Sequence, residues 1–234
     1  MAHRTRELDY GAGKWSAGNT SSFRARIIVI GKSLTATNSR LIILRPGHCR
    51  DAGKHGNSKY SLARDRKGIS MEMIVCGDVH HSYPTGAGEL VVLRGINLLI
   101  EQGEHVAIVG PSGAGKSTLL RLCAALDLPT SGEVRVGGIP TRELHGTALA
   151  RFRREHVGLI YQQFSLLPTL TSLENVMLPL LPYRSRHALR KRAIPLLTEV
   201  GLRERMEHYP EQLSGGEQQR VAIARAMIAS PPLL

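Results

Sequence analysis

The fold is decided by one stretch of this sequence, Gly110-Pro111-Ser112-Gly113-Ala114-Gly115-Lys116-Ser117-Thr118. The residues before it, Glu104 to Val109, form a short apolar run that is typical of a buried β-strand. The residues after it, Ser117 to about Ala125, carry leucines spaced for packing along a helix. Strand, glycine-rich loop and helix in this order match the phosphate-binding pattern G-x-x-x-x-G-K-[ST]. The sequence therefore predicts an α/β fold built around this loop.

Each residue type in the loop has a physical role in binding phosphate. Glycines permit a tight turn whose backbone N–H groups point inward at an anion. Lys116 has the reach for the β- and γ-phosphates, and the hydroxyl of Ser117 is a ligand for Mg²⁺. The N-terminus of the following helix adds its partial positive charge at the same point. The pattern predicts that the chain binds a nucleoside triphosphate together with Mg²⁺.

Length and composition limit the classes to which the chain can belong. Its 234 residues are 42% hydrophobic and 21% charged, which excludes a collagen-like chain and one disordered from end to end. No apolar run approaches the ~18 residues that a membrane span requires. The three cysteines, Cys49, Cys76 and Cys123, have neither the number nor the spacing of a disulfide framework or a zinc site. We expect one domain with possible appendages, and Cys123 as a small packing residue.

The net charge of +12 is concentrated at the start of the chain. Residues 1–70 hold 14 Lys and Arg against 4 Asp and Glu, whereas residues 71–234 hold 17 against 15. A nucleic-acid site would spread basic residues over a folded face, so no nucleic-acid partner is expected. Residues 1–70 lack a steady period and are interpreted as a disordered or spurious extension before Met71, with an organelle transit peptide or RNA binding as alternatives.

A second glycine motif stands at Leu213 to Arg220 and opens a helical run to Ala229. Ser214 and Glu217 form the S-x-x-E capping box, and glycines in the first turn leave backbone N–H groups open to an anion. One triphosphate rarely needs two such cradles, so the two motifs are expected to meet across a dimer interface. A capped helix with chance glycines is the alternative.

The motif Leu213-Ser214-Gly215-Gly216-Glu217-Gln218-Gln219-Arg220 resembles the signature of the ATP-binding cassette (ABC) ATPases, and the loop at 110–118 matches their phosphate loop. Tyr161 to Pro168 resembles their Q-loop, with Gln162 at the glutamine that contacts magnesium and the attacking water. Tyr83 stands where the family has an aromatic residue stacked on adenine, although a surface tyrosine would also fit. The neighbouring His80 and His81 are expected to be solvated.

The resemblance implies a P-loop NTPase with a parallel-sheet core, an antiparallel β subdomain at the start of a cassette over 71–234, and a helical subdomain at about 165–215. The implied catalytic residues are Lys116 and Gln162, and the implied magnesium ligands are Ser117 and Gln162. ATP would be held by Tyr83, Gly110, Pro111, Ser112, Gly113, Ala114, Gly115, Lys116, Ser117 and Thr118. The partner protomer's ATP would meet Ser214, Gly215, Gly216, Glu217 and Gln218.

The stretches Leu166 to Leu180 and Gly86 to Gly95 are similar to cassettes of the lipoprotein-release, macrolide-export and cell-division group. This implies a separate membrane permease as partner and a place on the inner face of the plasma membrane, reached through that permease. The apolar residues of 166–180 would line a groove for a permease helix, or belong to the core of the helical subdomain. Residues 184–208 predict an amphipathic helix with a basic face.

The family pattern continues with a buried strand that carries an aspartate and a water-polarising glutamate, followed by a switch histidine. This sequence stops at Leu234, at the start of that strand. We therefore expect hydrolysis to be impaired and the edge of the loop-bearing strand to be uncovered, with low stability as the result. The implied function is an ATP-hydrolysing transport subunit, and the alternative is a non-hydrolysing nucleotide-binding remnant or interaction protein.

Overall fold

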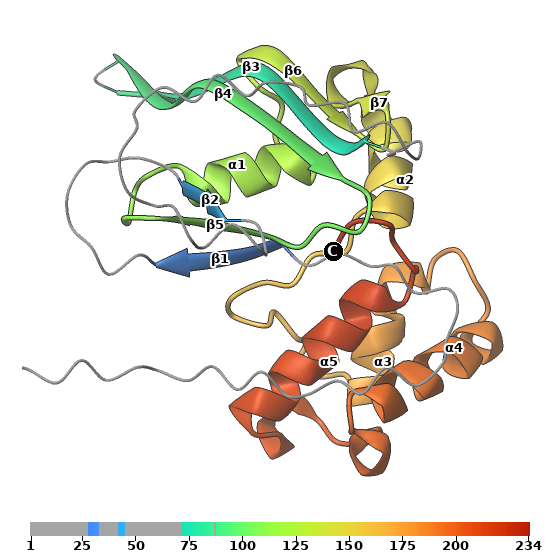
Figure 1. The fold of residues 1–234 in the computed structure, drawn as a ribbon. Helices are drawn as coiled ribbons and strands as arrows, with labels where there is room; N and C mark the ends of the chain where they lie inside the picture. Colours follow the sequence, from blue (N-terminus) through green and yellow to red (C-terminus); the bar gives the residue numbers. More distant parts are fainter. Residues whose placement is uncertain (1–27, 33–41, 45–71, 87) are drawn as a thin grey trace, which may run out of the picture.

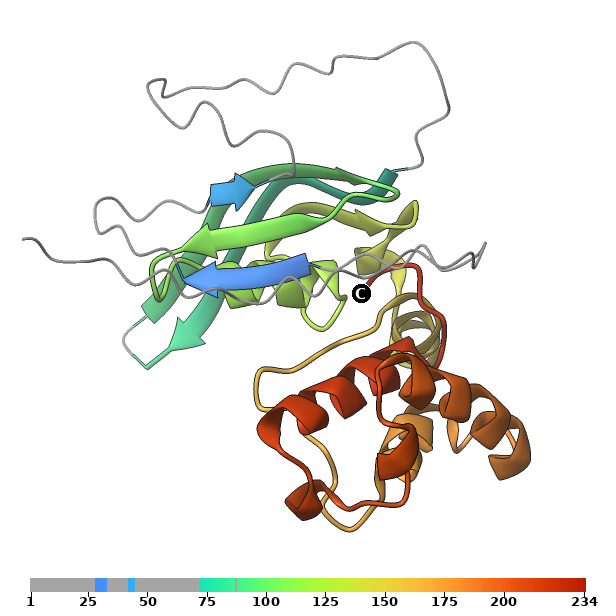
Figure 2. The ribbon, with the colours of Figure 1, turned by 60° about the horizontal axis from the view of Figure 1, so that its bottom comes forward.

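The computed structural model describes residues 28–32, 42–44, 72–86 and 88–234 (Figure 1). Within these residues the strands form two sheets, and one helix lies between the sheets (Figures 1 and 2). The first sheet has the strand order β4-β3-β6-β7 and is antiparallel throughout. Its strands are β3 (Glu72–Thr85), β4 (Gly88–Glu101), β6 (Ser131–Val136) and β7 (Ile139–Pro140).

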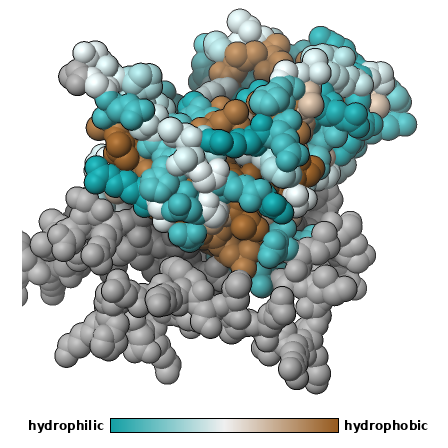
Figure 3. Space-filling model, turned by 90° about the horizontal axis from the view of Figure 1, so that it is seen from above, coloured by the Kyte–Doolittle hydropathy of each residue, from teal (hydrophilic) through white to brown (hydrophobic). Residues whose placement is uncertain are grey.

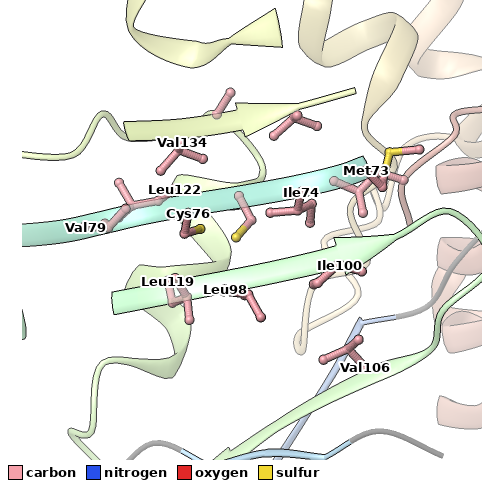
Figure 4. Packing of buried hydrophobic residues seen from close by; sticks show 14 of the residues in the cluster. Met73, Ile74, Cys76, Val79, Leu98, Ile100, Val106, Leu119, Leu122 and Val134 are labelled. Atoms are coloured by element: carbon pink, nitrogen blue, oxygen red, sulfur yellow. The ribbon is translucent and has the colours of Figure 1, made fainter. Parts of the chain in front are cut away.

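The second sheet has the order β1-β5-β2, with β1 (Ile28–Lys32) parallel and β2 (Ile42–Leu44) antiparallel to β5 (Val106–Gly110). Helix α1 (Lys116–Cys123) follows β5 and packs its leucines between the two sheets. Figure 4 shows Leu119 and Leu122 of α1 facing Ile74, Cys76 and Leu98 of the antiparallel sheet. Cys123 is 1% exposed in the same core, which confirms its prediction as a packing residue.

The structure corrects the expectation that the edge of the loop-bearing strand is uncovered. Both edges of β5 are paired, one by β1 and the other by β2. These two strands coincide with the apolar bursts of the first 70 residues, and unpaired edge N–H and C=O groups favour such pairing. The expectation of a disordered extension therefore does not hold for 28–32 and 42–44, while residues 1–27, 33–41 and 45–71 lie outside the described residues.

The helical part lies below the sheets in Figure 1 and has a core of its own. It contains α3 (Ser172–Met177), α4 (Arg186–Glu199) and α5 (Gly215–Met227), while α2 (Gly146–His156) lies beside the sheets. Short 3₁₀ turns occur at 141–143, 178–180, 203–205 and 210–212. The apolar core runs from Leu173 to Ile228, so the helical subdomain includes α5 and extends beyond the expected limit near 215.

Much of the apolar stretch 166–180 is core. Leu173, Val176, Met177 and Leu180 are all 5% exposed or less, whereas Leu167 is 43% exposed. Helix α4 buries Leu189, Ala193, Leu196 and Leu197 and exposes several arginines, as an amphipathic helix should. It ends at Glu199 rather than near 208, because Gly201 adopts a left-handed backbone with φ of +74°.

The last residues pair with the segment that leads into the Q-loop. Leu233 forms a parallel bridge with Val157, and the N–H of Gly158 donates to the Leu233 carbonyl at 2.8 Å. Gly158 is required here, because a Cβ would come within 2.6 Å of the Ala226 carbonyl oxygen. Residues 231–234 are thus packed against the main body.

The outer face of the antiparallel sheet, seen from above in Figure 3, is mostly hydrophilic with separate hydrophobic patches. Leu90 and Val91 of β4 are exposed at 57% and 41%. Exposed apolar residues such as these are normal at a protein surface. Among the described residues, no helix has both the length and the apolar character that a membrane span requires.

Candidate nucleotide-binding site

The phosphate loop links the carboxyl end of β5 to the N-terminus of α1, as the sequence predicts. Gly113 and Gly115 have φ of +81° and +84°, a left-handed backbone that favours glycine. Gly115 also has no room for a side chain, because a Cβ would lie 2.7 Å from Leu93 Cδ2 and 3.1 Å from the Val92 carbonyl oxygen. Strand β4 therefore lies against the loop at Gly115 and restricts its turn.

Lys116 lies over the loop that precedes it. Its Nζ donates to the carbonyl oxygens of Gly110 at 3.0 Å and Pro111 at 2.6 Å, and the side chain is 9% exposed. An ammonium group has three donors, so one remains for an anion beside the loop. The ammonium group is thus held against the loop by two of its own carbonyl oxygens.

The N-terminus of α1 has the features of an anion site. Its N-cap is Gly115, which supplies no capping side chain, and the first turn contains no acidic residue. The first N–H groups of a helix lack intrahelical partners, and the helix dipole favours negative charge there. Ser117 is exposed and Thr118 is buried, so the Ser117 hydroxyl is the one open to a bound magnesium ion. These donors fit a triphosphate.

Tyr83 lies in β3, near the part of β4 that supports the loop. Tyr83 pairs with Leu90 in the sheet. Two residues earlier, His81 pairs with Leu93, the residue whose side chain lies next to the Cβ position of Gly115. The Tyr83 hydroxyl donates to Asp127 Oδ2 at 3.3 Å. The ring is half-buried and packs edge-on against His81, with centroids 4.6 Å apart. Tyr83 is thus anchored to the segment that follows the C-terminal end of α1.

The expectation of two solvated histidines is wrong for His81. His81 is 7% exposed, and neither ring nitrogen has a hydrogen-bond partner among the described residues. The reason is the irregular pairing of β3 and β4, whose register shifts on both sides of His81 and turn its side chain inward. His80 is partly exposed, with Nε2 at 3.3 Å from Asp78 Oδ1.

Gln162 lies on an exposed turn between the two parts of the molecule. The N–H of Phe164 donates to the Tyr161 carbonyl at 3.1 Å, which closes the turn around Gln162. The side chain is exposed, and no described residue forms a hydrogen bond with it. Its amide is therefore free to bind a ligand, and among the described residues no hydrogen bond joins it to Lys116 or Ser117.

The signature segment forms the capping box that the sequence predicts. The Ser214 N–H and hydroxyl both donate to Glu217 Oε2 at 2.8 Å, and the Glu217 N–H donates back to Ser214 Oγ at 3.4 Å. These bonds, with a weaker contribution from Arg205 at 3.4 Å, lower the pKa of Glu217 below its usual value. Gly215 and Gly216 are exposed at the start of α5.

Gln218 has a structural role that its motif did not indicate. Its Nε2 donates to the carbonyls of Pro210 at 2.9 Å and Leu213 at 3.2 Å, so the amide nitrogen binds its own loop. Within the described residues, the signature and the phosphate loop share no hydrogen bond. The chain therefore presents two separate candidate anion sites, one on each part of the molecule.

Other supporting residues escaped the sequence analysis. Asp127 and Arg225 bind groups 44 and 60 positions earlier in the chain, and Asn175 binds the backbone of the loop just before its own helix. Of the three, only Arg225 gave a local signal, a charge within an apolar helical run. No group of three or more His, Cys, Asp or Glu side chains suited to a metal ion occurs in the part of the chain that the structure describes. A magnesium site here would depend on oxygen donors such as Ser117 and on the phosphates themselves.

Comparison with known proteins identifies the family. The ABC transporter family matches residues 93–234. The lipoprotein-releasing system ATP-binding protein LolD of Geobacter metallireducens is 52% identical over 160 residues, covering 67% of this chain and 70% of that protein. The macrolide export ATP-binding/permease protein MacB of Rhodopirellula baltica is 47% identical over 165 residues, covering 69% of this chain and 24% of that protein.

A solved structure agrees with this match. It is the dimeric, post-hydrolysis ATP-binding cassette MJ0796 of Methanocaldococcus jannaschii bound to ADP and Pi, with a TM-score of 0.61 and 40% identity. The match covers 69% of this chain and 72% of that one. The subgroup resemblance drawn from Leu166 to Leu180 is confirmed by the LolD and MacB matches. The chain therefore belongs to the ABC transporter family, as an ATP-binding protein with the α/β fold of the P-loop NTPases.

Proposed function

We propose that the chain binds MgATP at the phosphate loop and couples ATP binding and hydrolysis to a separate membrane permease. The observation that carries the proposal is the uncapped N-terminus of α1, with Gly115 pressed against β4 and Lys116 Nζ held over the loop. Such a cradle favours a polyphosphate because N–H donors, helix dipole and ammonium converge on one point.

The candidate site residues would have different roles in binding MgATP. Lys116 would neutralise the β- and γ-phosphates, and Ser117 and Gln162 would supply oxygen ligands to Mg²⁺, which favours such donors. When bound, Mg²⁺ offsets the negative charge of the triphosphate. Tyr83 is our candidate for adenine stacking because of the family resemblance at this position; it lies on β3, paired in the sheet with Leu90 of β4, and its ring is half-buried.

We propose a head-to-tail dimer in which Ser214, Gly215 and Gly216 meet the partner's ATP. The support is that these residues are exposed at an uncovered helix N-terminus, away from the phosphate loop of their own chain. The solved relative MJ0796 is likewise described as a dimer. Gln218 would support this surface by holding the loop before α5 rather than by touching ATP.

The permease is proposed to dock on the helical subdomain, at the inner face of the plasma membrane, for export or lipoprotein release. The support is a hollow of about 290 Å³ next to α3 and α4, whose lining includes Met177, Arg186, Arg190 and Tyr209. Mixed apolar and charged linings suit a polar peptide helix with apolar anchors. The similar proteins LolD, of a lipoprotein-releasing system, and MacB, a macrolide export protein, support this assignment.

We also propose the domain division implied by the family resemblance. The cassette would span 71–234, with its helical subdomain beginning near 165. Residues 1–70 would precede it, with 28–32 and 42–44 paired to β5 as described above.

The test uses two variants that damage opposite halves of the proposed composite site. Lys116→Ala removes the phosphate-binding ammonium, and Gly216→Asp places a negative charge at the signature. Each is expected to abolish ATP-driven dimerisation and ATP turnover alone, while an equal mixture regains part of both, because a mixed dimer contains one intact site. No recovery on mixing, with both variants folded, would contradict the head-to-tail arrangement. MgATP binding to the unaltered chain, measured by calorimetry, tests the nucleotide assignment independently of turnover.

A further inference from the structure

Arg225 of α5 forms hydrogen bonds to the backbone just after the candidate glutamine Gln162. Its Nη1 donates to the Ser165 carbonyl and its Nη2 to the Phe164 carbonyl, each at 2.6 Å. The two carbonyls belong to successive residues about 60 positions earlier in the chain, so the contact joins two distant segments. A planar guanidinium with parallel donors is suited to such a pair of acceptors, whereas an ammonium is not.

The two residues bound by Arg225 have an unusual backbone conformation. Phe164 and Ser165 have φ of +42° and +48°, in the left-handed region that non-glycine residues rarely adopt. Consecutive left-handed residues without glycine persist only where surrounding contacts hold them. Within the turn, the Phe164 N–H donates to Tyr161 and the Ser165 N–H donates to Gln163. Among the described residues, the two short hydrogen bonds from Arg225 are those that reach Phe164 and Ser165 from outside the turn, so they are placed to hold this conformation.

The environment of Arg225 makes these bonds important for the arginine as well. The side chain is half-buried, and burial lowers the pKa of its guanidinium. No carboxylate among the described residues forms an ion pair with it, so its charge is met by the two carbonyls. Substitution would leave the partly buried Phe164 carbonyl without this partner, which is unfavourable, whereas the exposed Ser165 carbonyl would bind water instead.

Helix α5 connects Arg225 to the signature segment. Ser214 caps the N-terminus of α5 and Arg225 lies near its other end, about 16 Å away for a helix rising ~1.5 Å per residue. On the other side, buried Asn175 binds Leu167, Leu170 and Thr171 and holds the end of the same loop. The segment between Gln162 and α3 is therefore fixed from two helices.

We propose that Arg225 is a positioning residue that sets Gln162 relative to the signature helix by holding Phe164 and Ser165 in their left-handed conformation. The proposal rests on the proposed function only in the role given to Gln162. The rigid α5 then makes the Q-loop of one nucleotide site and the signature of the other move together. A ligand that orders either segment is expected to order the other.

The first experiment measures amide hydrogen exchange in Arg225→Gln, Arg225→Lys and the exposed control Arg203→Gln. We expect the exchange rate of the amides of 162–167 to rise at least about tenfold in Arg225→Gln and less in Arg225→Lys, because lysine can replace only part of the hydrogen bonding to the two carbonyl oxygens. Arg203→Gln should leave it unchanged. Unchanged exchange at 162–167 in a folded Arg225→Gln protein would overturn the proposal.

A second variant separates positioning from a general loss of stability. Ser165→Gly, introduced into Arg225→Gln, relieves the left-handed strain at the gripped residue and is expected to recover part of the protection. If Arg225 only stabilised α5, the glycine would restore nothing, and exchange would rise along α5 as well; that result would also overturn the proposal.

Activity and binding then distinguish this proposal from the proposed function. Arg225→Gln is expected to lower kcat for ATP with KM nearly unchanged, because the phosphate loop does not contact Arg225. If the unaltered chain fails to bind MgATP, the proposed function fails, while the exchange result at 162–167 still decides the role of Arg225. A raised KM with unchanged kcat would contradict positioning of Gln162.

Discussion

Arg121 and Asp127 form a bidentate ion pair at the C-terminal end of α1, the helix that follows the phosphate loop. Arg121 Nε lies 2.6 Å from Asp127 Oδ2, and Arg121 Nη2 lies 2.8 Å from Asp127 Oδ1. The same carboxylate accepts the Tyr83 hydroxyl at 3.3 Å. Asp127 therefore links α1 to β3 and fixes the candidate adenine-stacking residue relative to the loop.

The first prediction concerns this link and its dependence on pH. Hydrogen bonds from Arg121 lower the pKa of Asp127 from its ordinary 3.8. A carboxyl with a lowered folded-state pKa stabilises the fold above pH 3.8, and this contribution is lost as the pH falls through the lowered value. Asp127→Asn should cost about 1 kcal/mol of unfolding free energy at pH 7.

Urea denaturation between pH 2 and 7 checks this prediction. The variant and the unaltered chain should converge in stability at the acid end, because both then lack the charge at position 127. A constant difference at all pH values would show that the carboxylate charge is not involved.

The second prediction compares two loop glycines. Gly113→Ala meets no atom within 4 Å, so only its left-handed backbone is penalised, by about 1 kcal/mol. Gly115→Ala meets Leu93 and Val92 in addition, which raises the loss of unfolding free energy to about 3 kcal/mol. Thermal unfolding of the two variants measures the difference, and equal losses would mean that the contact with β4 does not constrain the loop.

The third prediction concerns Lys116. Lys116→Met keeps the length of the side chain and removes the charge that would face the phosphates. We expect MgATP affinity to fall about 10- to 100-fold, as the loss of a charge-assisted hydrogen bond implies. Calorimetric titration is the measurement, with the exposed Lys191→Met as control. Comparable affinity in both variants would place the nucleotide elsewhere.

The fourth prediction concerns Asn175, which is completely buried. Its Oδ1 accepts from the Leu167 N–H at 2.8 Å, and its Nδ2 lies within 3.1 Å of three carbonyl oxygens. Asn175→Ala should cost about 3 kcal/mol, because these groups lose their partner inside the protein. Thr169→Ala, at an exposed position of the same loop, should change stability little. Urea denaturation of both variants is the test.

The fifth prediction concerns the strands on either side of β5. Removal of residues 1–27 leaves β1 and β2 in place, whereas removal of 1–71 takes both away. Only the longer deletion should speed hydrogen exchange of the amides of β5, since it uncovers both edges of that strand. Equal exchange in the two deletions would mean that β1 and β2 contribute nothing to the protection of β5.

Several features followed from short stretches of sequence. The phosphate loop, the capping box of Ser214 and Glu217, and the amphipathic character of α4 all matched the structure. These features depend on contacts between residues at most a few positions apart, and a local pattern of residue types is enough to specify them.

Other features depended on residues brought together by the whole fold. No local pattern predicted that Arg225 contacts Phe164 and Ser165, that His81 is buried, or that the apolar segments at 28–32 and 42–44 pair with β5. Such contacts join segments tens of residues apart, and each partner is compatible with many others until the chain folds. The sequence by itself therefore determined the nucleotide-binding motifs and the family. Only the tertiary structure decided how the Q-loop, the signature helix and the loop-bearing strand are held, because packing between distant segments selects those contacts.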